Sequence, residues 1–153
     1  MKAVIQRVLS AKVEVDNTMI GEIGHGLIIL LGVAHDDTED DVPLLCDKIV
    51  KMRIFEDEND KMNLSLKDVG GEMLVVSNFT LNANYKHGNR PDYLAGAKPD
   101  VANRLYEYFK SLMARELRHV GCGVFGAHMD VTLTNNGPVT IVMDSNVLKT
   151  KKS

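Results

Sequence analysis

The start of the chain alternates between apolar and polar side chains in a way that predicts strands. The alternation runs through residues 2–15, and Asp16 and Asn17 then mark a turn before a second strand at 19–23. Residues 26–33 form a continuous apolar run bounded by glycine, which is typical of a strand buried on both faces. We therefore expect an early hairpin followed by a central strand.

Two later segments carry apolar residues at helical spacing. Residues 38–55 place acidic side chains first and basic side chains last, which is the order that the helix dipole favours. The second segment begins at Pro99, which suits a first helical turn, and it runs to about Val120. These two segments predict the main helices.

Further strands are predicted on either side of the second helix. Residues 72–81 form a strong apolar strand, and residues 129–133 and 139–143 predict two more strands that flank a turn at 135–138. Residues 82–98 show no sustained periodicity. A loop of this length in a compact domain often carries function.

The order of these elements lacks the regular alternation of strand and helix that a doubly wound sheet requires. It predicts an α+β fold with a mostly antiparallel sheet rolled toward a barrel and two main helices. At 153 residues the chain suits a single domain. We place that domain at residues 1–146, followed by a flexible basic tail at 147–153.

Charge and hydropathy restrict the partners of the chain. The formal net charge is −3, so a contact with RNA must be local rather than a general coating of phosphates. No run reaches the roughly 18–20 apolar residues of a membrane span, and charge interrupts the first residues too early for a signal peptide. We expect a cytoplasmic protein without membrane association.

Metal and cofactor chemistry has no matching motif in the sequence. Cys46 and Cys122 lie far apart, and the 5 histidines never fall at the spacing of a helical zinc site. The glycines do not form a phosphate-binding loop. We therefore expect no metal and no cofactor.

Ser77 and Thr80, near the end of the strand predicted at 72–81, are the candidates for a nucleophile. A hydroxyl nucleophile needs a base, and no histidine or aspartate lies beside them in the sequence. The alternative is that both hydroxyls satisfy buried backbone groups. A serine or threonine esterase would require a base such as His87 or His128 within reach of Thr80.

Two motifs permit either a structural or a functional interpretation. In Gly137-Pro138 the glycine tolerates unusual φ values and the proline can adopt a cis peptide, so the pair can expose its backbone carbonyls. A plain turn explains the same residues. In residues 88–91, Arg90 can pair with an anion, although a lone loop arginine is usually solvated.

Four segments taken together carry a resemblance to a known family. The pattern MxAxIQRV occurs at residues 1–8, a variant of SQFTL at 77–81, GxRP at 88–91 and NxGPVT at 135–140. From residue 1 to about 144, the chain resembles the D-aminoacyl-tRNA deacylases of the bacterial and eukaryotic type. The resemblance implies hydrolysis of the ester bond at the 3′ end of D-aminoacyl-tRNA as a proofreading step. It also implies hydrolysis of the ester that joins mischarged glycine to tRNA-Ala.

The same resemblance implies roles for particular residues. It implies a homodimer in which Gly137-Pro138, with its proline cis, reaches into the partner's active site. There a backbone wedge would collide with an L side chain but not with hydrogen. Arg7 resembles the latch that holds this segment. Backbone N–H groups around Asn78 and Phe79 would stabilise the oxyanion, and the ribose 2′-OH would position water. The implied catalytic residues are Ser77, Asn78, Phe79 and Thr80, and those implied to bind substrate and select its chirality are Gly137, Pro138, Arg7, Val139 and Thr140.

Asn78 departs from the family motif, which usually has Gln at this position. If only the backbone N–H acts there, the shorter amide changes little, whereas a side chain that touches the terminal adenosine would change affinity. A module that binds the tRNA 3′ end without turnover would need the same pocket. It is the main alternative to an enzyme.

Overall fold

Strand β1 (Lys2–Val15) organises the sheet because it pairs with three other strands. In this computed structural model, which describes residues 1–149, β1 is antiparallel to β2 (Thr18–Ile23), β3 (Gly26–Gly32) and β8 (Asp130–Asp144). One edge of β1 is shared by β2 and β3, and the other edge is taken by β8. The early hairpin and the central strand are therefore confirmed.

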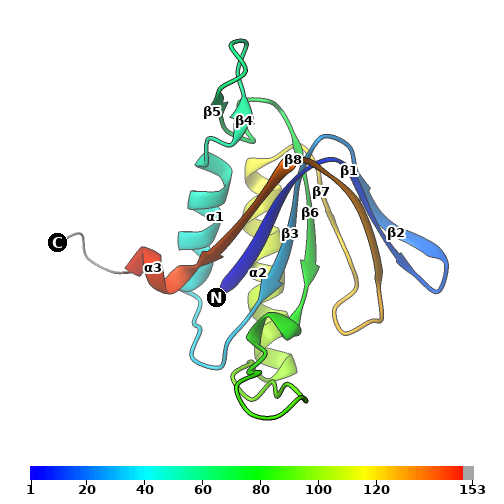
Figure 1. The fold of residues 1–153 in the computed structure, drawn as a ribbon, viewed down its shortest axis with the longest axis vertical. Coiled ribbons are helices and arrows are strands. Elements are labelled where there is room, and N and C mark those ends of the chain that lie inside the picture. The colour runs from blue at the N-terminus through cyan, green and yellow to red at the C-terminus, as the bar shows by residue number, and fades with distance from the viewer. Residues whose placement is uncertain (150–153) are drawn as a thin grey trace.

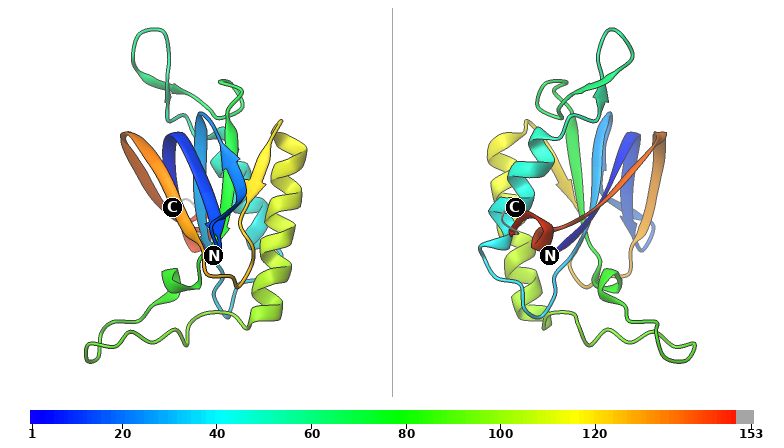
Figure 2. Two further views of the ribbon diagram at one scale, coloured as in Figure 1. Left: turned by 90° about the vertical axis from the view of Figure 1, so that its right-hand side faces the viewer. Right: turned by 60° about the vertical axis from the view of Figure 1, so that its left-hand side comes forward.

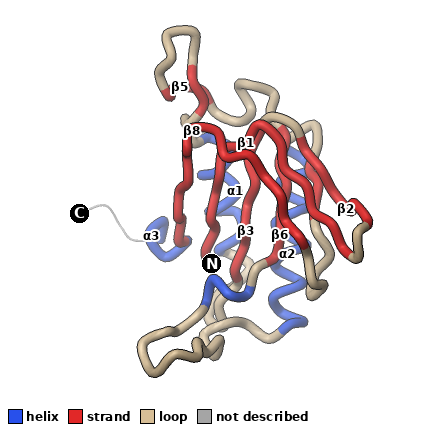
Figure 3. The backbone as a smooth tube through the Cα atoms, turned by 45° about the vertical axis from the view of Figure 1, so that its right-hand side comes forward, coloured by secondary structure: helices blue, strands red, loops and turns tan. Residues whose placement is uncertain are grey.

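The sheet continues beyond β3 and curls back toward its own beginning (Figure 3). Strands β6 (Glu72–Ser77) and β7 (Val120–Cys122) are added through parallel pairings, which gives the order β2-β1-β3-β6-β7. The two ends come close together, because a Cβ at Gly21 of β2 would lie 2.7 Å from the carbonyl oxygen of Cys122 in β7. The sheet is thus mixed and nearly closed, and the predicted α+β fold with a sheet rolled toward a barrel is confirmed.

Two long helices cover one face of this sheet (Figures 1 and 2). Apolar residues recur at helical spacing in α1 (Asp41–Lys51) and α2 (Pro99–Glu116), and they pack against buried residues of β1, β3 and β6. On the other face of the sheet, Ile28 and Leu74 belong to a second, smaller apolar cluster. Strand β3 is therefore buried on both sides, as its continuous apolar run predicts. No helix within the described part of the chain is long and apolar enough to cross a membrane.

The predicted turn at residues 135–138 lies inside one strand, so the prediction of two separate strands is wrong. Strand β8 stays paired with β1 on both sides, through Gln6 opposite Thr140 and Val8 opposite Asn135. Residues 136–139 of β8 therefore face the single residue Arg7 of β1. Pairing on both sides forces the turn-forming residues into a bulge instead of a hairpin.

Other element boundaries differ more modestly from the prediction. The strand predicted at 72–81 ends at Ser77, and a short 3₁₀ helix, η1 (Phe79–Asn82), follows it. The second helix ends at Glu116, which leaves room for β7. Short strands β4 (Phe55–Glu56) and β5 (Met62–Leu64) form a separate hairpin.

Part of the tail predicted at residues 147–153 is helical. Helix α3 (Ser145–Lys149) includes residues 147–149, while residues 150–153 of that prediction lie outside the described residues. Lys149 pairs with the buried carboxylate of Asp41 at 2.6 Å, and the hydroxyl of Ser145 donates to the same carboxylate at 2.6 Å. Burial alone would raise the pKa of Asp41, but these contacts and the Thr38 N–H hold that pKa at about 2. This charged cluster ties α3 to the beginning of α1.

Candidate functional site

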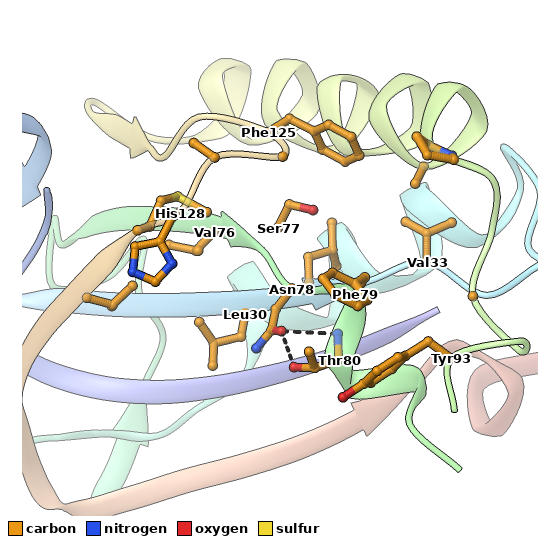
Figure 4. A pocket seen from close by; sticks show the side chains of 18 of the residues that line it. Leu30, Val33, Val76, Ser77, Asn78, Phe79, Thr80, Tyr93, Phe125 and His128 are labelled. Atoms are coloured by element: carbon orange, nitrogen blue, oxygen red, sulfur yellow. Dashed lines mark hydrogen bonds between the residues drawn. The ribbon is translucent and has the colours of Figure 1, made fainter. Parts of the chain in front are cut away.

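A cavity of about 860 Å³ opens where the parallel strands β3 and β6 end. Its wall is mostly apolar, and it is completed by the segment between β7 and β8 and by the loop before α2 (Figure 4). A cavity of this size and character is typical of a site for a small ligand or for one end of a larger one. The residues that line it include Leu30, Val33, Val76, Ser77, Asn78, Phe79, Thr80, Tyr93, Phe125 and His128.

All four residues implied to be catalytic line this cavity. They occupy the junction where β6 ends and η1 begins. The Asn78 N–H donates to the Leu31 carbonyl at 2.8 Å, so the end of β6 remains bound to β3. This hydrogen bond corrects one expectation, because the Asn78 N–H is already in use and is not available to an oxyanion. Among the described residues the Phe79 N–H has no acceptor, which makes it the donor of the two that a substrate can use.

The Asn78 side chain fixes the direction in which the Thr80 hydroxyl donates its proton (Figure 4). Its Oδ1 accepts from the Thr80 backbone N–H at 3.2 Å and from the Thr80 hydroxyl at 2.5 Å. A backbone N–H can only donate, so the amide atom that faces it is the oxygen, and the hydroxyl must give its single proton to that same atom. Thr80 Oγ1 therefore keeps its lone pairs for an incoming donor, and Asn78 Nδ2 is left without a hydrogen-bond acceptor among residues 1–149.

This direction of donation disfavours Thr80 as a nucleophile. An activated hydroxyl gives its proton to a base, whereas the proton of Thr80 points at an amide oxygen. His128 lines the cavity but makes no hydrogen bond to Thr80 within the described residues, and His87 is absent from the lining. The arrangement suits binding of a substrate group by Thr80 better than covalent catalysis.

The residues implied to select chirality form a second group outside this cavity, with Arg7 on β1 and the others on β8. Gly137 and Pro138 are exposed, and the peptide bond between them is cis. The buried guanidinium of Arg7 donates from Nε to the Asn136 carbonyl at 3.0 Å and from Nη1 to the Ile54 carbonyl at 2.8 Å. Arg7 thereby holds the bulge of β8 to the segment that precedes β4.

Side-chain contacts within the bulge explain its sequence. Gly137 has φ +140°, and a Cβ there would lie 2.7 Å from Cγ2 of Val139 and 3.3 Å from Nη2 of Arg7. Asn135 accepts from the Val139 N–H and donates to the Thr140 hydroxyl, both at 2.9 Å. Asn135 is thus a structural residue of the bulge that the sequence shows only as the first letter of a motif.

Within one chain, then, the structure brings the predicted residues together as two groups and not as one site. Residues 77–80 line the cavity, while Arg7, Gly137, Pro138, Val139 and Thr140 do not. The cavity wall formed by residues 125–133 and by Tyr93, Gly96 and Ala97 was not predicted. The sequence predicted a strand at 129–133, but hydrophobic periodicity does not show that the side chains of a strand line a cavity. Among the described residues no group of three His, Cys, Asp or Glu side chains is placed to hold a metal ion.

The model of one protein family, described as D-Tyr-tRNA(Tyr) deacylase, matches residues 4–144. The chain belongs to this deacylase family. A D-aminoacyl-tRNA deacylase of Clostridioides difficile (strain 630) is 56% identical over 146 residues, covering 95% of this chain and 98% of the relative. A protein of the same name from Thermus aquaticus is 53% identical over 146 residues, covering 95% and 96% of the two chains.

Solved structures support the same family fold. The c-Myc DNA Unwinding Element Binding Protein aligns with a TM-score of 0.89 and 38% identity, covering 94% of this chain and 98% of that one. A structure described as a probable eukaryotic D-amino acid tRNA deacylase aligns with a TM-score of 0.79, covering 93% and 97% of the two chains. At 16% identity this second likeness concerns the fold alone.

Proposed function

We propose that this protein hydrolyses the ester bond of D-aminoacyl-tRNA and releases the tRNA and the amino acid. The observation that carries this proposal is the family match over residues 4–144. The cavity lined by residues 77–80 supports it. In this proposal the protein acts on charged tRNA in the cytoplasm.

The cavity suits the 3′ end of such a substrate. Its volume of about 860 Å³ accommodates a terminal adenosine with an attached amino acid, and Phe125 and Tyr93 supply aromatic faces for a base. The Phe79 N–H donates to the ester oxygen that gains negative charge, and Thr80 Oγ1 accepts a hydrogen bond from the substrate. The substrate side of the site is therefore built from backbone and hydroxyl groups.

The reaction needs no further catalytic side chain, because an aminoacyl ester is already activated toward attack by water. Water attacks the carbonyl carbon, and the bond from this carbon to the ribose oxygen then breaks. The ribose oxygen leaves with a proton that comes from the attacking water. The neighbouring 2′-OH of the ribose positions that water, so no side-chain base is required.

We further propose that chirality is selected by Gly137 and Pro138 of a second copy of the chain. The pair is exposed and is anchored by Arg7, and it lies outside the cavity of its own chain. A rigid backbone segment beside the α-carbon excludes an L side chain by collision, and it leaves room for the hydrogen of a D residue or of glycine. Glycine mischarged on tRNA-Ala is accordingly a substrate in this proposal.

The experiment compares hydrolysis of D-Tyr-tRNA, L-Tyr-tRNA and Gly-tRNA-Ala by the wild-type protein. We expect release of D-Tyr and glycine with L-Tyr retained, and we expect the Pro138→Ala variant to lose this discrimination. The Pro43→Ala variant, which changes an exposed proline in α1, serves as the matched control. Binding of all three RNAs without release of any amino acid would contradict the enzyme, and equal release of D-Tyr and L-Tyr would contradict the wedge.

A measurement of mass in solution tests the second copy. A dimer is expected, and activity should be lost on dilution below its dissociation constant. A fully active monomer would show that Gly137 and Pro138 do not act across an interface.

A further inference from the structure

The loop before α2 forms an ordered arm that extends away from the sheet (Figures 1 and 2). Asn84 and Asp92 pair as an isolated antiparallel bridge, with backbone hydrogen bonds of 2.8 and 3.0 Å. Gly88, with φ +65°, turns the chain between them. Every residue from 84 to 95, which we call the arm, is exposed.

The base of the arm is fixed at the mouth of the cavity. The His35 N–H donates to the Ala95 carbonyl at 2.8 Å, and the Ala97 N–H donates to the Val33 carbonyl at 3.0 Å. The ring of Tyr93 packs edge-on against Phe79 at 5.0 Å between centroids, and both rings line the cavity. A molecule with one end in the cavity therefore passes the arm as it leaves.

The arm is basic although the whole chain carries a net charge of −3. It contains Lys86 and Arg90, neither of which makes an ion pair among the described residues. Its one acid, Asp92, lies at the base and accepts from the Leu94 N–H at 3.2 Å. By contrast, many cations elsewhere are paired, as Lys67 is with Glu116 at 2.7 Å.

Exposed apolar and aromatic surface accompanies these charges. Tyr85 is 81% exposed, beside Lys86 at one side of the tip. Single-stranded nucleic acid is bound by this combination, in which cations follow the phosphates and aromatic rings stack on bases. Surfaces that are buried against another protein are also rich in tyrosine and arginine, but they are depleted of lysine. Of these three tip residues it is therefore Lys86 that favours RNA over a second copy of the chain.

We propose that the arm binds the single-stranded nucleotides of tRNA that precede the terminal one, with Lys86 and Arg90 on their phosphates and Tyr85 against a base. This inference rests on the proposed function, which places the terminal nucleotide in the cavity. It also explains how an acidic protein can bind RNA, because the contact is confined to one arm.

The proposal predicts a measurable dependence on salt. Each phosphate contact to a single strand contributes about 0.7 to the slope of log affinity against log salt. Removal of both cations should therefore reduce that slope by about 1.4. If the variant and the wild type bind tRNA equally near 1 M salt, the variant should bind about 25-fold more weakly than the wild type at 0.1 M.

The test compares a Lys86→Ala/Arg90→Ala variant with a Lys48→Ala/Lys61→Ala control, which removes two exposed cations that neither line the cavity nor belong to the arm. Affinity for uncharged tRNA is measured at several salt concentrations. Hydrolysis is measured on D-Tyr-tRNA and on D-tyrosyl-adenosine, which has no phosphate for the arm. For the arm variant we expect the affinity for uncharged tRNA and the kcat/KM for D-Tyr-tRNA to fall by about 10-fold or more. Its hydrolysis of D-tyrosyl-adenosine should be unchanged, and the control variant should match the wild type in all three measurements.

Each other result has a distinct meaning. Equal hydrolysis of the D-Tyr-tRNA ester by the arm variant and the wild type would overturn the role of the arm and leave the proposed function intact. Weaker tRNA binding by the arm variant, with no hydrolysis by the wild type, would support the arm and contradict the proposed function. A halved mass in solution with equal losses on both substrates would show that the arm holds a second copy, which overturns the proposal. A Tyr85→Ala variant should weaken tRNA binding by about fivefold or more, and no change would remove the stacking contact from the proposal.

Discussion

Replacement of Arg7 by methionine removes the guanidinium that joins three parts of the fold. Its Nη1 donates to the Ile54 carbonyl at 2.8 Å and its Nε to the Asn136 carbonyl at 3.0 Å. Its Nη2 also lies 3.3 Å from a carboxylate oxygen of Glu56. The Arg7 side chain is only 5% exposed, so water cannot readily replace these contacts. Methionine preserves much of the apolar stem but none of the donors.

The expected loss of stability follows from the two carbonyls. A buried acceptor that loses a charged donor costs about 1–3 kcal/mol. The pair with Glu56 adds little, because the Glu56 side chain is 50% exposed and the interaction is screened by water. The loss of both donors should therefore lower the free energy of unfolding by about 2–6 kcal/mol. For a chain of this length each kcal/mol lowers Tm by about 2–4 °C, so a decrease of about 10 °C is expected.

Thermal unfolding followed by circular dichroism measures this change, and Arg53→Met is the matched control. Arg53 is an exposed arginine with a single hydrogen bond, from Nε to the Asn63 carbonyl at 2.9 Å. Its replacement should cost less than about 1 kcal/mol. At a temperature where Arg7→Met is still folded, discrimination between D-Tyr-tRNA and L-Tyr-tRNA should weaken. The same Tm for both variants would refute the structural reasoning, and unchanged discrimination by a destabilised variant would refute the link from Arg7 to the bulge.

Three further outcomes test the fold. The pKa of Asp41, at about 2, lies below its ordinary value, so its contribution of about 2 kcal/mol is present above pH 4 and is lost as pH falls toward 2. In urea unfolding at pH 7, Asp41→Asn should be less stable than the wild type by about this amount. If the difference in unfolding free energy between the two proteins did not become smaller toward pH 2, the lowered pKa would be contradicted. Burial raises the pKa of Cys46 to about 12, so a thiol reagent at pH 7 should modify the half-buried Cys122 and leave Cys46 unmodified, as peptide mass mapping would show. Gly26→Ala places a Cβ against backbone of the facing strand and should cost more than about 3 kcal/mol, whereas Gly24→Ala meets only a side-chain oxygen at 3.4 Å and should be tolerated in the same urea assay.

Much of the architecture could be predicted from the sequence because its signals are local. The apolar run of β3 and the helical spacing in α1 and α2 report burial along a single element, and these elements form where they were expected. A strand was also expected over residues 72–81, but β6 ends at Ser77 because the Asn78 side chain caps the 3₁₀ helix that follows. Such a cap competes with the strand in a way that hydrophobic periodicity does not show.

The family motifs included four residues that line the cavity, 77–80, and the bulge residues 135–140, but only as separate stretches of sequence. The sequence by itself showed that residues 77–81 and 135–140 match family motifs and that no metal-binding motif accompanies them. It did not show whether the two stretches meet. In the folded chain they do not, because residues 77–80 line the cavity while Gly137 and Pro138 lie exposed on β8.

Only the tertiary structure decided how each group can act. The residue types of Gly137-Pro138 favour a turn, but the pair forms a bulge because β8 pairs with β1 on both sides of it. The Asn78 N–H was a candidate oxyanion donor, and it is occupied because β3 places the Leu31 carbonyl 2.8 Å away. In both cases the deciding partner comes from a strand distant in the sequence. A pattern along one segment records which residues are buried, but the partner of each hydrogen bond is fixed only when the strands are assembled.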